Sequence, residues 1–264
     1  MTRTLCTLLT ILCIAAVLLI PSSAFAQIPL GTAQSFAVLG GSTVTNTGPT
    51  TITGDLGVSP GSSVTGFPPG IVTGGSIHAA DSVAAQAQSD LTTAYNTAAG
   101  TPCNVDLTGQ NLGGLVLTPG VYCFTSSAAL TGTLTLNFQG NPNAAFLFKI
   151  GSTLTTASGS TIVLTNNFGA TCPPNVNWQV GSSATLGTGS TFVGNILALT
   201  SITMTTGTNL RGRALARNGA VTLDSNTVGL CPLTAPVPAL GSLGLMILMT
   251  LLAGAGVLVM KRAV

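Results

Sequence analysis

An internal repeat in the last third of the chain constrains the fold more than any other feature of the sequence. Residues 186–198 align with residues 204–216 at an offset of 18 positions, and a third copy begins at Leu223, one residue late. Threonine alternates with aliphatic residues within the copies, which places the two kinds of side chain on opposite sides of a strand. A period this short is typical of one coil of a β-solenoid, whose inward aliphatic residues stack into a core. A β-sandwich of short strands is the competing interpretation.

The rest of residues 27–231 continues the pattern of short apolar and Thr/Ser segments separated by Gly, Asn or Pro. Such a pattern predicts many short strands joined by tight turns. One stretch differs, because residues 76–99 carry apolar residues three and four positions apart, with Asp81 near the start and Gly100 just past the end. The spacing predicts an α-helix over 76–99 in an otherwise all-β domain.

Both ends of the chain carry segments of a different kind. Residues 1–26 have a basic start, an apolar run and a small-residue cleavage site, which predicts a signal peptide and a mature chain that begins at Gln27. Residues 232–239 are proline-rich and predict a stiff linker. Residues 240–262 form an uncharged run followed by two basic residues, which predicts a transmembrane helix. We therefore expect an exported domain, secreted or anchored to the membrane.

Cysteine usage agrees with export. Four cysteines remain beyond the signal peptide, and an oxidising compartment would allow them to pair in three ways. We favour Cys103 with Cys123, across a glycine-rich turn, and Cys172 with Cys231. No Cys-x-x-Cys motif or histidine partner accompanies them, so we expect no metal.

Charged residues are scarce. The chain has 7 Lys and Arg, 5 Asp and no Glu, and its net charge is +2. This charge is too small for the basic surface that nucleic-acid binding requires. The carboxylates are few and widely spaced, and a carbohydrate-active solenoid enzyme would need two of them close together. With a single histidine, His78, and no nucleophile or phosphate-loop motif, we expect no enzymatic activity and no cofactor.

Threonine is the abundant polar residue, with 36 in residues 27–235. The two repeats carry Thr-Gly-Ser-Thr at 188–191 and Thr-Gly-Thr-Asn at 206–209 in register. Stacked coils would place equivalent side chains about 4.8 Å apart. A ladder of hydroxyl and methyl groups at that spacing can hold an ordered array of water. The candidate site residues are Thr188, Ser190, Thr191, Thr206, Thr208, Asn209 and Ser225.

Seven stretches that span almost the whole domain carry a resemblance to a known family. They are residues 35–48, 54–61, 106–114, 117–122, 146–155, 178–187 and 212–224. In these the chain resembles the ice-binding proteins of bacteria, fungi and algae. The resemblance implies a discontinuous β-solenoid of triangular cross-section with a long helix packed along it, a non-enzymatic function, and ice as the partner. It also implies a Thr-Ala/Gly-x-Thr/Asn motif on the binding face, which residues 188–191 and 206–209 match.

The tail carries a second resemblance. Val-Pro-Ala-Leu at 237–240, the apolar span and the basic end are similar to C-terminal sorting signals of Gram-negative bacteria, which implies a sorting protease as a further partner. We expect the domain to be a monomer that inhibits ice growth and recrystallisation. A surface adhesin or structural module that binds polysaccharide or other cells on the same scaffold is the alternative function.

Overall fold

The computed structural model describes residues 27–141, 143–167 and 175–230. The chain divides into two units, Met1–Cys231 and Pro232–Val264, and all described residues belong to the first. The predicted signal peptide, linker and C-terminal tail lie outside the described residues, as do Cys172 and Cys231. Within the described ranges, no helix is long and apolar enough to cross a membrane.

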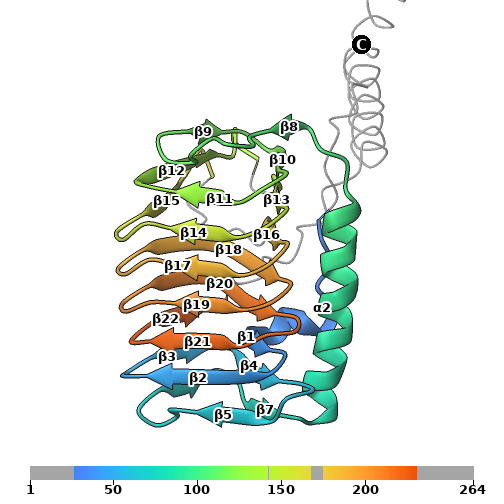
Figure 1. The fold of residues 1–264 in the computed structure, drawn as a ribbon, viewed down its shortest axis with the longest axis vertical. Coiled ribbons are helices and arrows are strands. Elements are labelled where there is room, and N and C mark those ends of the chain that lie inside the picture. The colour runs from blue at the N-terminus through green and yellow to red at the C-terminus, as the bar shows by residue number, and fades with distance from the viewer. Residues whose placement is uncertain (1–26, 142, 168–174, 231–264) are drawn as a thin grey trace, which may run out of the picture. The chain divides into compact units, whose positions relative to one another are not determined.

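The described strands wind into a three-sided solenoid in which neighbouring strands pair in parallel (Figure 1). A complete coil places one strand on each side before the chain moves to the next coil. Parallel pairing of this kind excludes the β-sandwich, whose sheets are antiparallel. The predicted class, mostly β with one helix, is confirmed.

One side is a seven-stranded sheet, here called the threonine face. Its strands in spatial order are β11 (Ala128–Leu130), β14 (Leu154–Thr156), β17 (Ala184–Leu186), β19 (Ile202–Met204), β21 (Val221–Asp224), β2 (Thr43–Thr47) and β5 (Ser63–Thr65).

The other two sides share a larger sheet, because the long strands β18 (Thr191–Ala198) and β20 (Asn209–Ala216) bend from one side to the other. The helix side holds their second halves with β8 (Val105–Asp106), β10 (Gly120–Phe124), β13 (Phe146–Ile150), β16 (Val176–Val180), β1 (Phe36–Gly40), β4 (Asp55–Val58) and β7 (Ile77–Ala79). The third side holds their first halves with β9 (Val116–Leu117), β12 (Thr133–Asn137), β15 (Thr161–Thr165), β22 (Thr227–Gly229), β3 (Thr51–Thr53) and β6 (Ile71–Thr73).

The order of coils in space differs from their order in the chain. β1, β2 and β3 pair with β20, β21 and β22, so the N-terminal coils stack on the C-terminal ones. After β7, helix α2 (Ser82–Gly100) runs along the solenoid to its other end, where β8 and β9 begin (Figure 1). The later coils then return toward the N-terminal coils. The first and last described strands are therefore neighbours in space.

The repeat predicts the register of the last coils correctly. β18 pairs with β20 from Thr191 with Asn209 to Ala198 with Ala216, an offset of 18 residues. β19 pairs with β21 so that Met204 lies beside Leu223. This is one residue later than a strict offset of 18, as the late start of the third copy predicts. Each copy is thus one coil.

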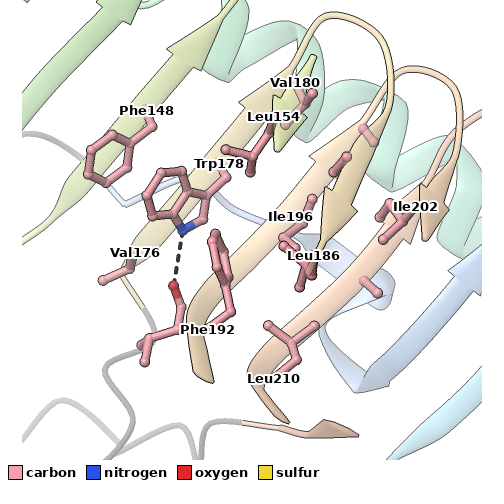
Figure 2. Close-up of a cluster of buried hydrophobic side chains, with 14 of the residues drawn as sticks. Phe148, Leu154, Val176, Trp178, Val180, Leu186, Phe192, Ile196, Ile202 and Leu210 are labelled. Atoms are coloured by element: carbon pink, nitrogen blue, oxygen red, sulfur yellow. Dashed lines mark hydrogen bonds between the residues drawn. The ribbon is translucent and has the colours of Figure 1, made fainter. Parts of the chain in front are cut away.

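Stacked inward side chains form the solenoid core (Figure 2). The rings of Phe148 and Trp178 lie parallel with their centroids 3.8 Å apart, and Phe192 packs on the other side of Trp178. Trp178 donates its indole N–H to the carbonyl of Val193 at 3.0 Å, which pairs the one polar atom of this buried ring. Equivalent positions of successive coils thus fill one continuous apolar interior.

Helix α2 begins later than the predicted residue 76. Residues Ile77–Ala79 form strand β7, which pairs with β4 and extends the sheet by one more coil. The helix starts at Ser82 because the Asp81 carboxylate caps it, accepting the backbone N–H of Ala84 at 2.8 Å. Its buried face packs on the helix side through Ala84, Ala87, Leu91, Ala94, Tyr95 and Ala98.

A short N-terminal arm completes this interface. It contains the 3₁₀ helix η1 (Gly31–Ser35), and Ile28, Leu30 and Ala33 are buried with α2. The guanidinium of Arg213 is buried, and it donates to the carbonyl of Gln34 and to Asn195 Oδ1. Burial lowers the pKa of Arg213 to about 10.

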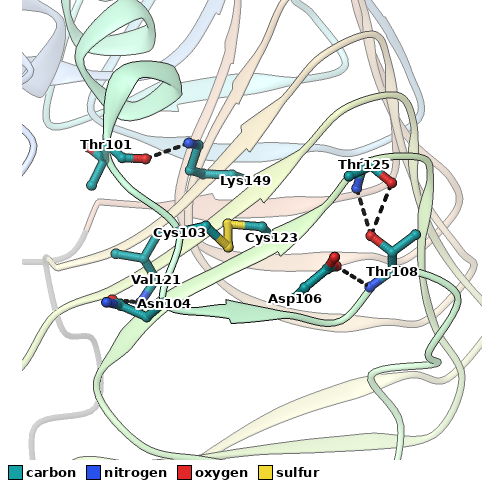
Figure 3. Close-up of a disulfide and its surroundings, with 9 residues drawn as sticks. All are labelled: Thr101, Cys103, Asn104, Asp106, Thr108, Val121, Cys123, Thr125 and Lys149. Carbon is teal, nitrogen blue, oxygen red and sulfur yellow. Dashed lines mark hydrogen bonds between the residues drawn. A yellow bond between two sulfur atoms is a disulfide. The ribbon is translucent and has the colours of Figure 1, made fainter.

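Cys103 and Cys123 form a disulfide with their Cα atoms 6.0 Å apart, so the first predicted pairing is confirmed (Figure 3). It joins the segment after α2 to strand β10. Beside it, Lys149 donates to the carbonyl of Thr101 at the end of the helix. The second predicted pairing, Cys172 with Cys231, lies outside the described residues.

Candidate functional site

A row of threonines in register runs along the middle of the threonine face. Each belongs to a different strand, and the two residues beside it in five of the six strands are buried, so its own side chain points outward. The row, here called the central ladder, consists of Thr155, Thr185, Thr203, Thr222, Thr45 and Thr65. Ala129 on β11 ends it at one side. Neighbouring threonines lie about one strand spacing apart, roughly 4.8 Å.

A second hydroxyl row lies two positions earlier in each strand or the turn before it. Thr43 and Ser63 pair directly, and the others follow from the registers of the central ladder. The row consists of Ser127, Thr153, Ser183, Ser201, Ala220, Thr43 and Ser63, of which all but Ala220 carry a hydroxyl group. Together the two rows make a two-dimensional array of hydroxyl and methyl groups.

Most central-ladder hydroxyls remain available to solvent. In the described part of the chain, those of Thr155, Thr185, Thr203 and Thr65 have no hydrogen-bond partner, and Thr45 reaches Thr222 only at 3.5 Å. Each such hydroxyl can donate one hydrogen bond and accept two. The central ladder can therefore bind water along its whole length.

Glycines at one corner allow the coils to stack closely enough for this register. A Cβ on Gly181 would lie 2.5 Å from the carbonyl oxygen of Gly151, and one on Gly151 would lie 2.6 Å from that of Thr125. Real Cβ contacts are longer than this, so the corner accepts only glycine without displacement of the next coil. The regularity of the threonine face depends on these positions.

The threonine face is almost without charge. Asp224, the last residue of β21, is the one charged side chain on it among the described residues. The others lie on the helix side, on the third side or on α2, namely Asp55, His78, Asp81, Asp90, Asp106, Lys149, Arg211, Arg213 and Arg217. A charged ligand would find little to pair with on this surface.

The closest group of titratable side chains is structural. His78 Nδ1 lies 2.7 Å from Asp81 and its Nε2 lies 4.0 Å from Asp55. Asp81 caps α2, and its pKa is lowered first by the backbone N–H of Ala84 and then by His78. Within the described ranges, no three His, Cys, Asp or Glu side chains are arranged to hold a metal ion.

The predicted site residues fall on two neighbouring parts of the solenoid. Thr188 and Thr206 are exposed in the turns that leave the threonine face, and the amide after Thr188 donates to the carbonyl of Thr206. Thr191 and Asn209 are paired at the start of the third side, in a row with Thr133, Thr161, Thr227 and Thr51.

The remaining predicted residues present less to the surface. Ser190 and Thr208 are buried, and their hydroxyls bond inward to the carbonyls of Ala157 and Thr205. Ser225 is half-buried in a left-handed turn with φ of 53°, and its hydroxyl donates to Asp224. Burial takes Ser190 and Thr208 away from any flat surface.

Sequence reasoning missed the central ladder, although the chain carries a signal for it. The pattern Gly-Ser-Ser/Thr, apolar residue, Thr occurs at 41–45, 61–65, 151–155 and 181–185. Each occurrence turns a corner on glycine and then places two hydroxyl residues on the threonine face. The copies are unequally spaced along the chain, and this hides them from a search for a fixed period.

A protein-family model and a named relative both match most of the chain. A family model described as ice-binding-like matches residues 38–229. A protein of Nostoc sp. (strain HG1) named "Ice-binding protein" is 65% identical over 208 residues, which cover 78% of this chain and 76% of that protein.

Solved structures of ice-binding proteins also match the chain. The crystal structure of an ice binding protein from an Antarctic biological consortium matches with a TM-score of 0.75 and 50% identity, over 79% of this chain and 93% of that one. An ice-binding protein from the Antarctic ascomycete Antarctomyces psychrotrophicus matches with a TM-score of 0.73 and 42% identity, over 77% and 98% of the two chains.

Proposed function

The chain belongs to the ice-binding-like family, and from this membership we propose that it adsorbs to ice through the threonine face. It is an ice-binding protein and not an enzyme. Family membership supplies the partner, and the arrangement of this chain's own residues supports the choice of face.

The central ladder is the observation that carries the proposal. Six threonines in register repeat a hydroxyl and a methyl group at strand spacing, and the second row repeats hydroxyls beside them. Such an array can hold a layer of water molecules at a spacing that the protein backbone fixes. Water ordered in this way can merge with the surface of a crystal.

Inhibition follows from adsorption. An ice front that meets bound molecules can advance only between them, so it becomes curved. A curved front has a higher free energy than a flat one, and further growth at the same temperature is opposed. Small crystals then stop exchanging water with large ones, which is inhibition of recrystallisation.

The two other sides fit ice less well. Helix α2 and the N-terminal arm cover the helix side. On the third side, the first row is regular, but the second row mixes Thr135, Val163 and the charged Arg211. The turn residues Thr188 and Thr206 extend the threonine face at its edge.

Substitution in the middle of the central ladder tests the proposal. Thr203→Tyr places a ring that stands above its neighbours and prevents flat contact, so we expect the concentration needed to stop recrystallisation to rise at least about tenfold, or ~1.4 kcal/mol of adsorption. The measurement is crystal size in annealed ice films that contain the purified protein. Thr93→Tyr, on the exposed surface of α2, is the matched control and should behave as the unsubstituted protein.

Two results would count against the threonine face. If Thr203→Tyr inhibits as well as the control, the adsorbing surface lies elsewhere, and Thr188→Tyr with Thr206→Tyr then tests the neighbouring turns. If the unsubstituted protein leaves crystals to coarsen as in buffer but is retained on cell-wall glycans, the adhesin function replaces this one.

We also propose that the domain is exported and that the tail tethers it to the cell surface. The support is the sequence of residues 1–26 and 240–262 together with the Cys103–Cys123 disulfide, a bond that persists in oxidising compartments. A sorting protease that acts on the tail belongs to this proposal. Export would bring the threonine face to ice that forms outside the cell.

A further inference from the structure

We propose that Asp224 limits how tightly the threonine face adsorbs to ice, so that this face is weaker than its threonine content would allow. The inference rests on the proposed function, and it assigns one specific residue the role of setting affinity. Asp224 is the only charged side chain that the described residues place on this face.

Asp224 occupies a position where the neighbouring coils have hydroxyl residues. It pairs with Thr47 of β2 on one side. On the other side, its carbonyl accepts the N–H of Gly207, which places it beside Thr206. In its strand it follows the buried Leu223, so alternation points its side chain outward with that of Thr222.

The carboxylate draws neighbouring hydroxyl hydrogens toward itself. Thr206 Oγ1 donates to Asp224 Oδ2 at 2.5 Å, and Ser225 Oγ donates to Asp224 Oδ1 at 3.1 Å. Each hydroxyl has one hydrogen, so neither Thr206 nor Ser225 can also donate to water outside. Thr206, which would otherwise extend the threonine face, can therefore only accept hydrogen bonds from water.

The charge adds a second cost. Water next to a carboxylate points its hydrogens toward the oxygens, whereas ice requires each water to donate two hydrogen bonds and accept two. Removing the strongly bound hydration water of an ion is expensive compared with removing that of a hydroxyl. The half-buried carboxylate therefore keeps water that does not fit a crystal against the edge of the face.

Neutral replacements separate the charge from the local structure. Asp224→Asn keeps an oxygen that can accept from Thr206 or Ser225, and Asp224→Thr restores the residue type of Thr47 in the next coil. We expect each to lower the concentration that stops recrystallisation by about two- to fivefold, the equivalent of up to ~1 kcal/mol. Asp106→Asn, which neutralises an exposed aspartate outside the threonine face, is the matched control and should leave the inhibition of recrystallisation unchanged.

The measurements are inhibition of recrystallisation and the unfolding temperature of the same preparations. The proposal is overturned if Asp224→Asn and Asp224→Thr, with unfolding temperatures like the unsubstituted protein, inhibit equally or less well. If Asp224→Asn is unstable, Asp224→Thr alone decides. Thr203→Tyr in parallel keeps the two claims apart: its loss of inhibition supports the threonine face, whatever the Asp224 variants do.

Discussion

At the scale of single residues, the aromatic side chains of the core stack on one another across neighbouring coils. Phe148 and Trp178 stack at an interplanar angle of 7°, and both are fully buried. Trp178 also contacts Phe192, which belongs to the third side of the solenoid. A truncating substitution in such a stack removes contacts on both sides of the ring. It also leaves a cavity in a closely packed core, which adds to the cost.

Trp178→Ala is therefore expected to destabilise the domain by about 3–5 kcal/mol, the range for aromatic residues removed from a packed core. The measurement is the free energy of unfolding in denaturant. Thr93→Ala on the exposed surface of α2 is the control and should stay within about 0.5 kcal/mol. A loss below 1 kcal/mol for Trp178→Ala would contradict the stacked core.

Sequence reasoning at this scale succeeds within strands and fails at turns. The pairing of Thr191 with Asn209 follows from the repeat, because equivalent strand residues must stack. Ser190 and Thr208 precede them in the turns, where side chains no longer alternate, and their hydroxyls bond backbone carbonyls inside the corner. Composition alone does not distinguish an inward hydroxyl from an outward one.

At the scale of elements, α2 and the N-terminal arm hold each other through Asp90. Its carboxylate accepts the backbone N–H and the hydroxyl of Thr32, both at 2.7 Å, and the side-chain amide of Gln86 at 2.9 Å. These hydrogen bonds, the backbone one first, hold the pKa of Asp90 below its usual range. The folded state thus favours the ionised carboxylate.

This shift predicts how stability depends on pH. A carboxyl whose pKa is lowered by folding contributes fully above the pKa of the unfolded chain, near 4, and the contribution is lost as pH falls through the folded value. Asp81 and Asp106 are shifted in the same direction. We expect the unfolding temperature to be steady from about pH 7 to 5 and to fall below about pH 4.

Asp90→Asn should lower the unfolding temperature at pH 7, because the hydrogen bonds to an ionised carboxylate are lost. It should also reduce the fall of the unfolding temperature in acid, because this carboxylate is no longer there to be protonated. Ser89→Ala, the neighbouring exchange on α2, is the control and should keep the original pH dependence. An acid transition in Asp90→Asn identical to that of the unsubstituted protein would show that the contact with Thr32 contributes nothing.

The spacing predicts the helix itself correctly, but the predicted start at residue 76 is wrong. Residues 76–80 continue the apolar pattern in sequence, yet Ile77–Ala79 finds a strand partner in β4. Hydrogen bonds to a neighbouring coil outweigh local periodicity, and such partners are not visible in the segment's own sequence. Asp81 was the better marker, because its carboxylate is the cap.

At the scale of the whole molecule, the threonine face is built from both ends of the domain. Thr45 and Thr222 lie side by side although they are 177 residues apart in sequence. The central ladder exists only because the N-terminal coils stack on the C-terminal ones. A repeat that is read along the chain finds two or three coils, and the complete face requires the pairing of distant strands.

The most direct test of the account is whether growing ice takes up the protein through this face. A hemisphere of ice is grown slowly in a dilute protein solution, and the protein concentrations in the ice and in the remaining liquid are measured. Three proteins are compared: the unsubstituted chain, the double variant Thr185→Tyr with Thr203→Tyr, and Thr93→Tyr. We predict that the unsubstituted chain and Thr93→Tyr enter the ice, and that the double variant stays in the liquid. Equal uptake of all three, or exclusion of the unsubstituted chain, would contradict adsorption through the threonine face.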